Sequence, residues 1–164
     1  SAEQMFKLVN DVRSYPSFVS GCVATHVLEE HSELLVATLQ LKQAGVGLSL
    51  TTRNRLEYPH AMYLTLEDGS LKQLTGSWEF IALRASACNV ARTLEFQLAG
   101  GVASFAAGKV LASEAKSLIE VLAHRAAQLY PVQRSWRGNR LEQREEVMRE
   151  VSAAPQGAAR AATA

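Results

Sequence analysis

The sequence predicts an α+β fold in which a curved antiparallel sheet of about six strands grips a long C-terminal helix. Residues 23–98 alternate apolar and polar side chains with a period of two, which is typical of half-buried strands. Residues 101–130 repeat apolar side chains at spacings of three and four, which is typical of an amphipathic helix. Short turn sequences interrupt the first region, so neighbouring strands are expected to pair as hairpins.

A short helix is predicted before the sheet. Ser1-Ala2-Glu3-Gln4 has the form of a capping box, in which Ser1 is the N-cap and Gln4 reaches back to it. Tyr15-Pro16 is expected to end the helix, because the residue before a proline is driven out of the helical region. Between these two sequences the apolar residues keep helical spacing over about three turns: Met5, Leu8, Val9 and Val12.

The predicted strands are separated by polar or glycine-containing turns. Glu30–Glu33 is a polar turn between the first two strands, and Asp68-Gly69 is a strong hairpin sequence. We expect the strands to cover residues 23–29, 34–41, 48–56, 61–66, 74–80 and 88–98. The last three strands share an apolar face, formed by Met62, Leu64, Leu74, Trp78, Phe80, Leu94 and Phe96.

The long helix follows Gly100-Gly101 and is stopped by Pro131. At 1.5 Å per residue, a helix of about 30 residues is about 45 Å long, enough to cross a whole sheet. Its apolar stripe comprises Leu111, Ala115, Leu118, Leu122, Ala126 and Leu129. We therefore predict one domain over residues 1–130, followed by a charged and then Ala-rich mobile tail over residues 131–164.

The composition is that of a globular protein. The 164 residues are 48% hydrophobic and 20% charged, so a sizeable core is expected. The formal net charge of +1 argues against a chain-wide electrostatic interaction with nucleic acid, and no DNA partner is expected. Two cysteines are too few for a disulfide framework. No signal peptide and no apolar run of about 18 residues is present, which predicts a cytoplasmic location.

The sequence contains no recognisable catalytic or metal-binding motif. The four histidines lack metal-ligand spacing, and Gly45-Val46-Gly47 lacks the third glycine of a dinucleotide-binding loop. Glu79 and Glu95 could be paired carboxylates, but both alternate opposite the apolar residues and are expected to be solvated. We expect no catalytic residues, no metal site and no required cofactor, and therefore a protein that is not an enzyme.

The apolar strand faces allow two interpretations, because they could fill a solid core or line a cavity for an apolar ligand. Arg92 bears on the choice, since it lies on the apolar side of its strand between Val90 and Leu94. A buried arginine needs a partner or an opening to water. Snorkelling or a local bulge would explain Arg92, and so would a polar position inside a pocket.

Several local sequences narrow the fold further. They are Asn10-Asp11-Val12 with Tyr15-Pro16 and Phe18, Gly21-Cys22, Thr51-Thr52-Arg53-Asn54, Asp68-Gly69 with Leu74-x-Gly76-x-Trp78-x-Phe80, Leu94-Glu95-Phe96 and His124-Arg125-Ala126-x-x-Leu129-Tyr130. With this order of elements, residues 1–130 resemble the helix-grip fold of the START/SRPBCC superfamily. Within it they are similar to the coenzyme Q-binding START-type family and its bacterial ribosome-association toxin branch. That family begins with a strand before the first helix, so the fold is expected here with that strand missing.

The resemblance implies two functions, neither of them catalytic, although names such as polyketide cyclase/dehydrase are attached to these domains. One is binding of ubiquinone or a similar isoprenoid lipid between sheet and helix, in support of cellular respiration, with transient contact at the inner membrane surface. The other is binding to the large ribosomal subunit, which blocks subunit joining. We predict ligand binding first and ribosome association as the alternative.

The predicted ligand-binding residues combine the apolar strand faces, the inner stripe of the long helix and Arg92. They are Met62, Leu64, Leu74, Trp78, Phe80, Arg92, Leu94, Phe96, Leu111, Leu118 and Leu122. Ribosome binding would instead need a cluster of basic side chains, since residues 1–130 carry 11 basic and 12 acidic residues. Its candidates are Lys42, Arg53, Arg55, Lys72 and Arg84.

Overall fold

The computed structural model describes residues 1–131, apart from the side chains of residues 102–104, so most of the predicted tail lies outside the described residues. The chain begins with helix α1 (Ala2–Asn10) and the short 3-10 helix η1 (Val12–Ser17), and it ends with helix α2 (Val102–Leu129). Between them lie β1 (Cys22–His31), β2 (Leu34–Gln43), β3 (Val46–Glu57), β4 (Ala61–Gly69), β5 (Leu71–Arg84) and β6 (Ala87–Leu98). No helix among the described residues is long and apolar enough to span a membrane.

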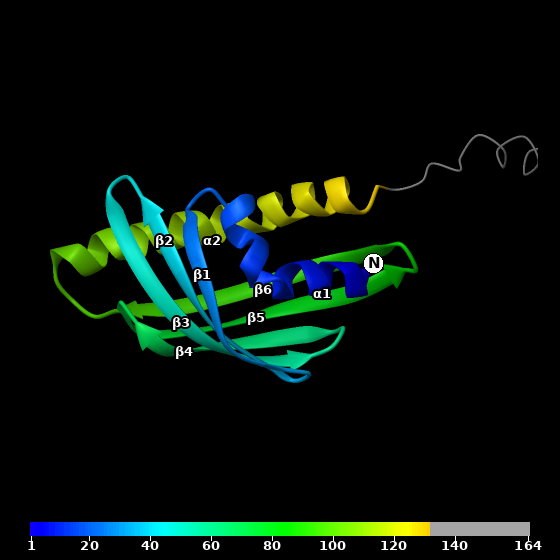
Figure 1. The fold of residues 1–164 in the computed structure, drawn as a ribbon, viewed down its shortest axis with the longest axis horizontal. Coiled ribbons are helices and arrows are strands. Elements are labelled where there is room, and N and C mark those ends of the chain that lie inside the picture. The colour runs from blue at the N-terminus through cyan, green and yellow to red at the C-terminus, as the bar shows by residue number, and fades with distance from the viewer. Residues whose placement is uncertain (132–164) are drawn as a thin grey trace, which may run out of the picture. The chain divides into compact units, whose positions relative to one another are not determined.

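The six strands form one antiparallel sheet in the order β1-β2-β3-β4-β5-β6, which confirms the predicted architecture. Each strand pairs with its neighbour in the chain, because short turns return the backbone directly alongside itself. Figure 1 shows the sheet curving round α2, which crosses its concave face and contacts β2, β3 and β6. The sheet and the helix therefore enclose the interior of the fold.

The prediction for the first helix was partly wrong. The capping box is present, since Ser1 Oγ accepts a hydrogen bond from the backbone N–H of Gln4 at 3.3 Å. The α-helix ends at Asn10, however, and Pro16 lies inside η1 instead of terminating α1. A proline fits a 3-10 turn because its fixed φ matches that geometry. The Tyr15 hydroxyl donates to the Val9 carbonyl at 2.7 Å and so fixes η1 against α1.

The strands are longer than alternation predicted. β5 runs to Arg84, four residues beyond Phe80, and its hairpin partner β6 begins at Ala87. This extension carries exposed Ile81 and Leu83. Burial no longer alternates there, so the sequence pattern could not reveal the continuing backbone pairing.

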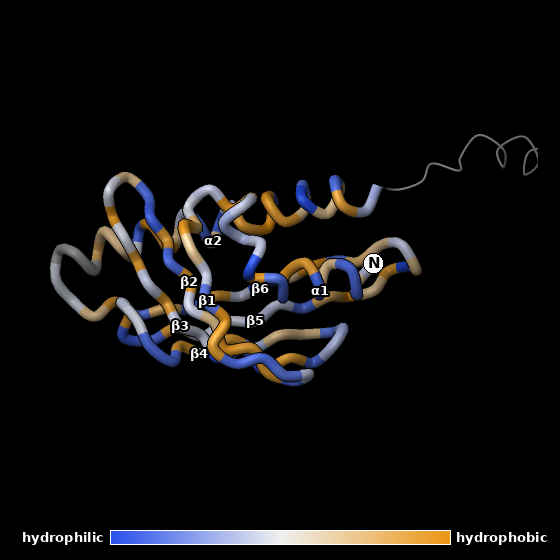
Figure 2. The backbone as a smooth tube through the Cα atoms, viewed as in Figure 1, coloured by the Kyte–Doolittle hydropathy of each residue, from blue (hydrophilic) through white to orange (hydrophobic). Residues whose placement is uncertain are grey.

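The core fills the space between the concave face of the sheet and the helices. The ring of Phe6 from α1 packs on Phe80 of β5, with centroids 5.4 Å apart, and edge-on against Tyr58 at 5.1 Å. Leu122 of α2 is 1% exposed. Figure 2 shows that the apolar residues in the C-terminal half of α2 lie on the side of the sheet, with hydrophilic residues opposite. Amphipathic packing therefore holds the helix in place, as its periodicity predicted.

Candidate functional site

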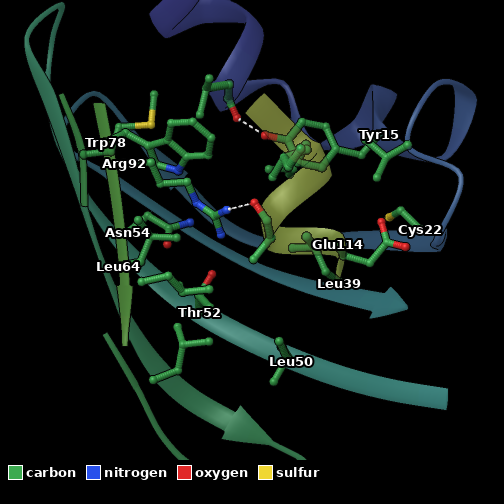
Figure 3. A pocket seen from close by; sticks show the side chains of 18 of the residues that line it. Tyr15, Cys22, Leu39, Leu50, Thr52, Asn54, Leu64, Trp78, Arg92 and Glu114 are labelled. Atoms are coloured by element: carbon green, nitrogen blue, oxygen red, sulfur yellow. Dashed lines mark hydrogen bonds between the residues drawn. The ribbon is translucent and has the colours of Figure 1, made fainter. Parts of the chain in front are cut away.

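A cavity of about 110 Å³ lies inside the fold, and its lining comes from α1, η1, every strand and α2. Figure 3 shows part of this lining, with side chains of the sheet facing those of η1 and α2. Pockets for drug-sized ligands usually measure about 300–1,000 Å³, whereas a cavity of about 150 Å³ binds benzene. The cavity in this state is therefore smaller than one that holds a benzene ring, and a bound ring or a longer ligand would require the walls to separate.

The structure brings together most of the predicted ligand-binding residues. Eight of them line the cavity: Met62, Leu64, Leu74, Trp78, Arg92, Leu94, Leu111 and Leu118. Phe80, Phe96 and Leu122 also belong to the apolar interior but do not line the cavity. Alternation identified the correct face of each strand. It could not show how far along that face the helices pack directly onto the sheet. A ligand-binding role for these residues stays a prediction.

Cross-strand registers explain why these residues meet. One row across the concave face runs Leu56, Met62, Trp78, Arg92, because each pairs with the next on the adjoining strand. The next row runs Asn54, Leu64, Gly76, Leu94. Side chains in one row point to the same face of the sheet. Two polar residues therefore interrupt these rows: Arg92 ends the first on β6, and Asn54 lies in the second between Leu64 and Leu35 of β2.

Arg92 occupies a polar position inside the pocket, which decides between its two sequence interpretations. Its Nη1 donates to the backbone carbonyl of Ala115 in α2 at 2.6 Å, and its Cζ lies 5.0 Å from the ring centroid of Trp78. Burial lowers the pKa of Arg92 from its usual value, and the nearby Tyr15 partly opposes that effect. The guanidinium nonetheless stays charged, because the ordinary pKa of arginine is far above neutral pH.

Sequence reasoning missed three buried polar residues of the lining, although the same patterns contained them. Thr52 and Asn54 occupy the same face of β3 as Leu48, Leu50 and Leu56, because every second residue of a strand points to one side. The period of two therefore already put them on the inner face. Glu114 lies three residues after Leu111 and four before Leu118, within the inner stripe of α2. A search for apolar residues alone could not find them.

Glu114 lies against the start of the sheet. Its Oε1 accepts a hydrogen bond from Gln43 at 3.3 Å, and the side chain is packed directly over Gly21. A Cβ added at Gly21 would lie 2.2 Å from Glu114 Oε1. Glycine at position 21 therefore provides the space in which this carboxylate is buried.

The potential nucleophiles of the cavity are held in their neutral forms. Burial raises the pKa of the Tyr15 phenol far above its usual value, and burial also raises the pKa of the Cys22 thiol. A reactive cysteine normally has a lowered pKa and a neighbouring base or cation. Both cysteines are free, and residues 1–131 contain no group of three or more candidate metal ligands. Glu79 and Glu95 are exposed on their strands, as predicted.

The basic residues proposed for a ribosome-binding patch do not form one cluster. Arg53 pairs with Glu67 at 2.8 Å and Glu29 at 3.8 Å, and Arg55 pairs with Glu57. The three other candidates make no ion pair within the described residues: Lys42 and Lys72 lie at one end of the sheet, near the β2–β3 and β4–β5 turns, and Arg84 at the other. Of the five candidates, Lys42 and Lys72 are therefore the two unpaired ones that share an end of the sheet.

A curved antiparallel sheet gripping a long C-terminal helix over an apolar cavity defines a START-type helix-grip protein. Residues 1–123 match the family model described as polyketide cyclase / dehydrase and lipid transport, and the chain belongs to this family. The family resemblance and the fold predicted from the sequence are thereby confirmed.

Two named relatives are similar to this chain in sequence over 130 residues. "Ribosome association toxin RatA" of Escherichia coli K12 is 35% identical over 130 residues, covering 79% of this chain and 82% of the relative. The protein of the same name in Vibrio cholerae (strain O395) is 38% identical over 130 residues, covering 79% and 90%.

Solved structures of low sequence identity share the fold. The Zhui aromatase/cyclase from Streptomyces sp. R1128 superposes with a TM-score of 0.68 at 17% identity, covering 80% of this chain and 90% of that one. A START superfamily protein from Mycobacterium smegmatis superposes with a TM-score of 0.65 at 16% identity, covering 79% and 91%. At such low identity these likenesses concern the fold alone.

Proposed function

We propose that this protein associates with the ribosome and acts as a toxin by binding, without catalysis. The observation that carries the proposal is its 35–38% identity, over 130 residues, to proteins named ribosome association toxin RatA. The similarity extends over 82–90% of those relatives, so it involves the whole domain and not one motif. As the family resemblance implies, the target is the large ribosomal subunit and the effect is to block subunit joining.

The charge distribution supports a local contact with ribosomal RNA at one end of the sheet. Residues 1–130 carry 11 basic and 12 acidic side chains, so no overall positive field attracts RNA. Lys42 and Lys72 are exposed and free of ion pairs within the described residues, which leaves them available for phosphates. Arg53 and Arg55 already neutralise glutamates and contribute less.

Co-sedimentation with separated ribosomal subunits tests this proposal. The full chain should pellet with large subunits but not with small ones, and binding should fall steeply between 50 and 200 mM salt because phosphate contacts release counterions. Adding the protein before the subunits are mixed should reduce the yield of joined ribosomes. Failure to pellet with large subunits at low salt would contradict the proposal.

The cavity favours a second candidate function, the binding of ubiquinone or a similar isoprenoid lipid. Leucine is the commonest residue of its lining, which also includes Met62 and Trp78, and burial of each CH₂-sized group contributes about 0.8 kcal/mol. The present volume of about 110 Å³ fits only part of such a molecule, so α2 would have to move away from the sheet on binding. Organic extraction of the purified protein followed by mass spectrometry tests this: an isoprenoid lipid should be recovered in near-stoichiometric amount.

The buried groups support a non-enzymatic role for both candidates. Enzymes such as aromatase/cyclases share this fold, so the fold alone does not decide the matter. In this cavity Tyr15 donates to a backbone carbonyl and Cys22 is stabilised as a neutral thiol, and neither group is activated. We place the protein in the cytoplasm, with transient contact at the inner membrane surface if it exchanges lipid. Cell fractionation tests this placement: most of the protein should be in the soluble and ribosomal fractions.

A further inference from the structure

The sheet wall of the cavity carries polar side chains that a purely apolar ligand would leave unused. Thr52 and Asn54 stand on the inner face of β3, and Arg92 extends from β6 alongside Trp78. Figure 3 shows the side chains of Asn54 and Arg92 pointing into the same part of the cavity. Met62, Leu64 and Leu94 line the cavity around them, so these polar groups stand among apolar side chains.

The Asn54 amide has an unmet hydrogen-bonding requirement. Asn54 is 7% exposed, and its Oδ1 has no hydrogen-bond partner among the described residues. Buried polar atoms are rarely left without a partner, because each unpaired atom destabilises the fold. The Oδ1 atom can only accept a hydrogen bond, so the group it lacks is an N–H or O–H donor.

The Arg92 guanidinium has the opposite requirement. It carries five N–H donors, and within the described residues its side chain makes one hydrogen bond, from Nη1 to the Ala115 carbonyl. No carboxylate among the described residues lies within 4 Å of it. Glu114, the acidic residue of the lining, is turned toward Gly21 and Gln43. The group that Arg92 lacks is therefore an acceptor oxygen.

We propose that Asn54 and Arg92 form a site for the hydroxyl group of a phenol-type ring. The ring hydroxyl donates to Asn54 Oδ1, its oxygen accepts an N–H from Arg92, and the ring lies among the leucines beside Trp78. A hydroxyl meets both requirements at once, whereas a quinone carbonyl or a carboxylate only accepts. The volume of about 110 Å³ is nearer to that of a one-ring cavity than to that of a drug-sized pocket, so one such ring needs only a small separation of the walls. The proposal rests on apolar-ligand binding and makes its ligand a hydroquinone or another phenol, in preference to a quinone or a fatty acid.

A matched pair of small probes tests the site. In p-xylene a methyl group replaces the hydroxyl of p-cresol, so the two differ in hydrogen bonding and hardly in shape. Each is titrated into the full chain by NMR, following the indole N–H of Trp78, which a Trp136→Phe variant assigns. Benzoate, a ring with a carboxylate, is the third probe. We expect p-cresol to bind about tenfold more tightly than p-xylene, since a site built for a hydroxyl rejects the analogue that lacks it.

Two substitutions separate the roles of the two residues. Asn54→Leu removes the unpaired amide at similar volume, so the variant should fold, and its preference for p-cresol should fall to about one. Arg92→Met should also weaken p-cresol binding while p-xylene binding is kept. Thr51→Val is the matched control, because Thr51 is buried next to Thr52 on β3 but bonds to Thr38 outside the cavity and should leave the preference unchanged.

Three results would overturn the site. Equal affinity for p-cresol and p-xylene in the unsubstituted protein would mean that the amide turns over and bonds to Arg92 internally. Tighter binding of benzoate than of p-cresol would assign the site to carboxylates. Binding of no probe would also remove the support for an apolar ligand, whereas the first two results would leave that function standing. Ribosome association is measured independently of all three.

Discussion

The guanidinium of Arg92 lies over the indole ring of Trp78, with Cζ 5.0 Å from the ring centroid. The two residues are direct cross-strand partners on β5 and β6, so the sheet register places one beside the other. From there Nη1 reaches the Ala115 carbonyl of α2 at 2.6 Å. One cation therefore connects the two walls of the cavity, and its energetic contribution depends on contacts that only a planar, extended guanidinium makes.

We expect Arg92→Lys to destabilise the protein more than Arg92→Met. Lysine keeps a half-buried charge but loses the planar stacking on Trp78 and the reach to Ala115, whereas methionine removes the charge together with its desolvation cost. A hydrogen bond to a charged group contributes about 1.5–3 kcal/mol, so Arg92→Lys should lose about 2 kcal/mol and Arg92→Met about 1 kcal/mol or less. Urea unfolding of both variants measures the difference. Wild-type stability in Arg92→Lys would show that the contacts contribute nothing.

The fold could be predicted from sequence because periodicity and turn residues act locally. Asp68-Gly69 marked the turn between β4 and β5, and Gly100-Gly101 marked the start of α2. The strand ends were less predictable, since β5 continues to Arg84 through exposed residues that no longer alternate. Likewise Pro16 was expected to terminate a helix and instead lies within a 3-10 turn.

The cavity could be predicted only in part, because its limits depend on how distant elements pack. Alternation gave the inner face of each strand, including Leu64, Trp78 and Leu94. It could not tell that Phe80 would pack on Phe6 and leave no space beside it. Asn54 falls on the inner face by the same alternation, but the expected lining was defined by hydrophobicity alone and so left it out.

Gly21→Ala should destabilise the protein through Glu114. The new Cβ would lie 2.2 Å from Oε1 of a side chain that is only 7% exposed, so the carboxylate would have to leave its place and its bond to Gln43. Overpacking of this kind costs about 1–3 kcal/mol. In a Glu114→Ala background the obstacle is gone, and Gly21→Ala should cost less than about 0.5 kcal/mol. A double-mutant cycle by urea unfolding measures this coupling, and additive costs would contradict it.

The stability of the protein should fall above pH 10 because of Tyr15. Burial raises the pKa of Tyr15 in the folded protein, whereas in the unfolded chain the phenol ionises near its ordinary value of 10.0. The stability that the neutral Tyr15 phenol contributes is therefore complete well below pH 10 and is lost as the pH rises, since the unfolded state then binds fewer protons than the folded state.

Comparison with Tyr15→Phe isolates this effect. At pH 8 the variant should be about 1 kcal/mol less stable, because it lacks the hydrogen bond to Val9. By pH 11 the wild type should have lost about 1.4 kcal/mol through Tyr15, so the two proteins should be nearly equal. Urea midpoints at both pH values test this. The ionisation of Cys22 contributes equally to both proteins and cancels in the comparison. A difference in unfolding free energy that stays constant with pH would show that burial does not raise the pKa of Tyr15.

Ribosome association should depend on unpaired cations and not on paired ones. Lys42→Gln with Lys72→Gln removes two exposed charges at one end of the sheet, and should weaken binding and reduce the salt-dependence slope by about two. The control is Arg53→Gln with Arg55→Gln, which removes the same charge from residues already paired with glutamates. Co-sedimentation over a salt series compares the two. A stronger loss in the control would place the contact on the outer face of β3.

Filling the cavity should separate the two proposed functions. Leu94 lines the cavity from β6, and Leu94→Phe adds a ring where the free volume is only about 110 Å³. The ring should occupy the space that a ligand needs, so extractable lipid and binding of small aromatic probes should both be lost. Val90→Leu is the control, because Val90 lies on the same strand outside the cavity lining and should leave ligand binding intact. Ribosome co-sedimentation should be unchanged in both variants, since the proposed RNA contact lies on the surface at Lys42 and Lys72. Loss of ribosome association in Leu94→Phe alone, with its melting temperature within a few degrees of wild type, would show instead that an occupied cavity is required for ribosome association.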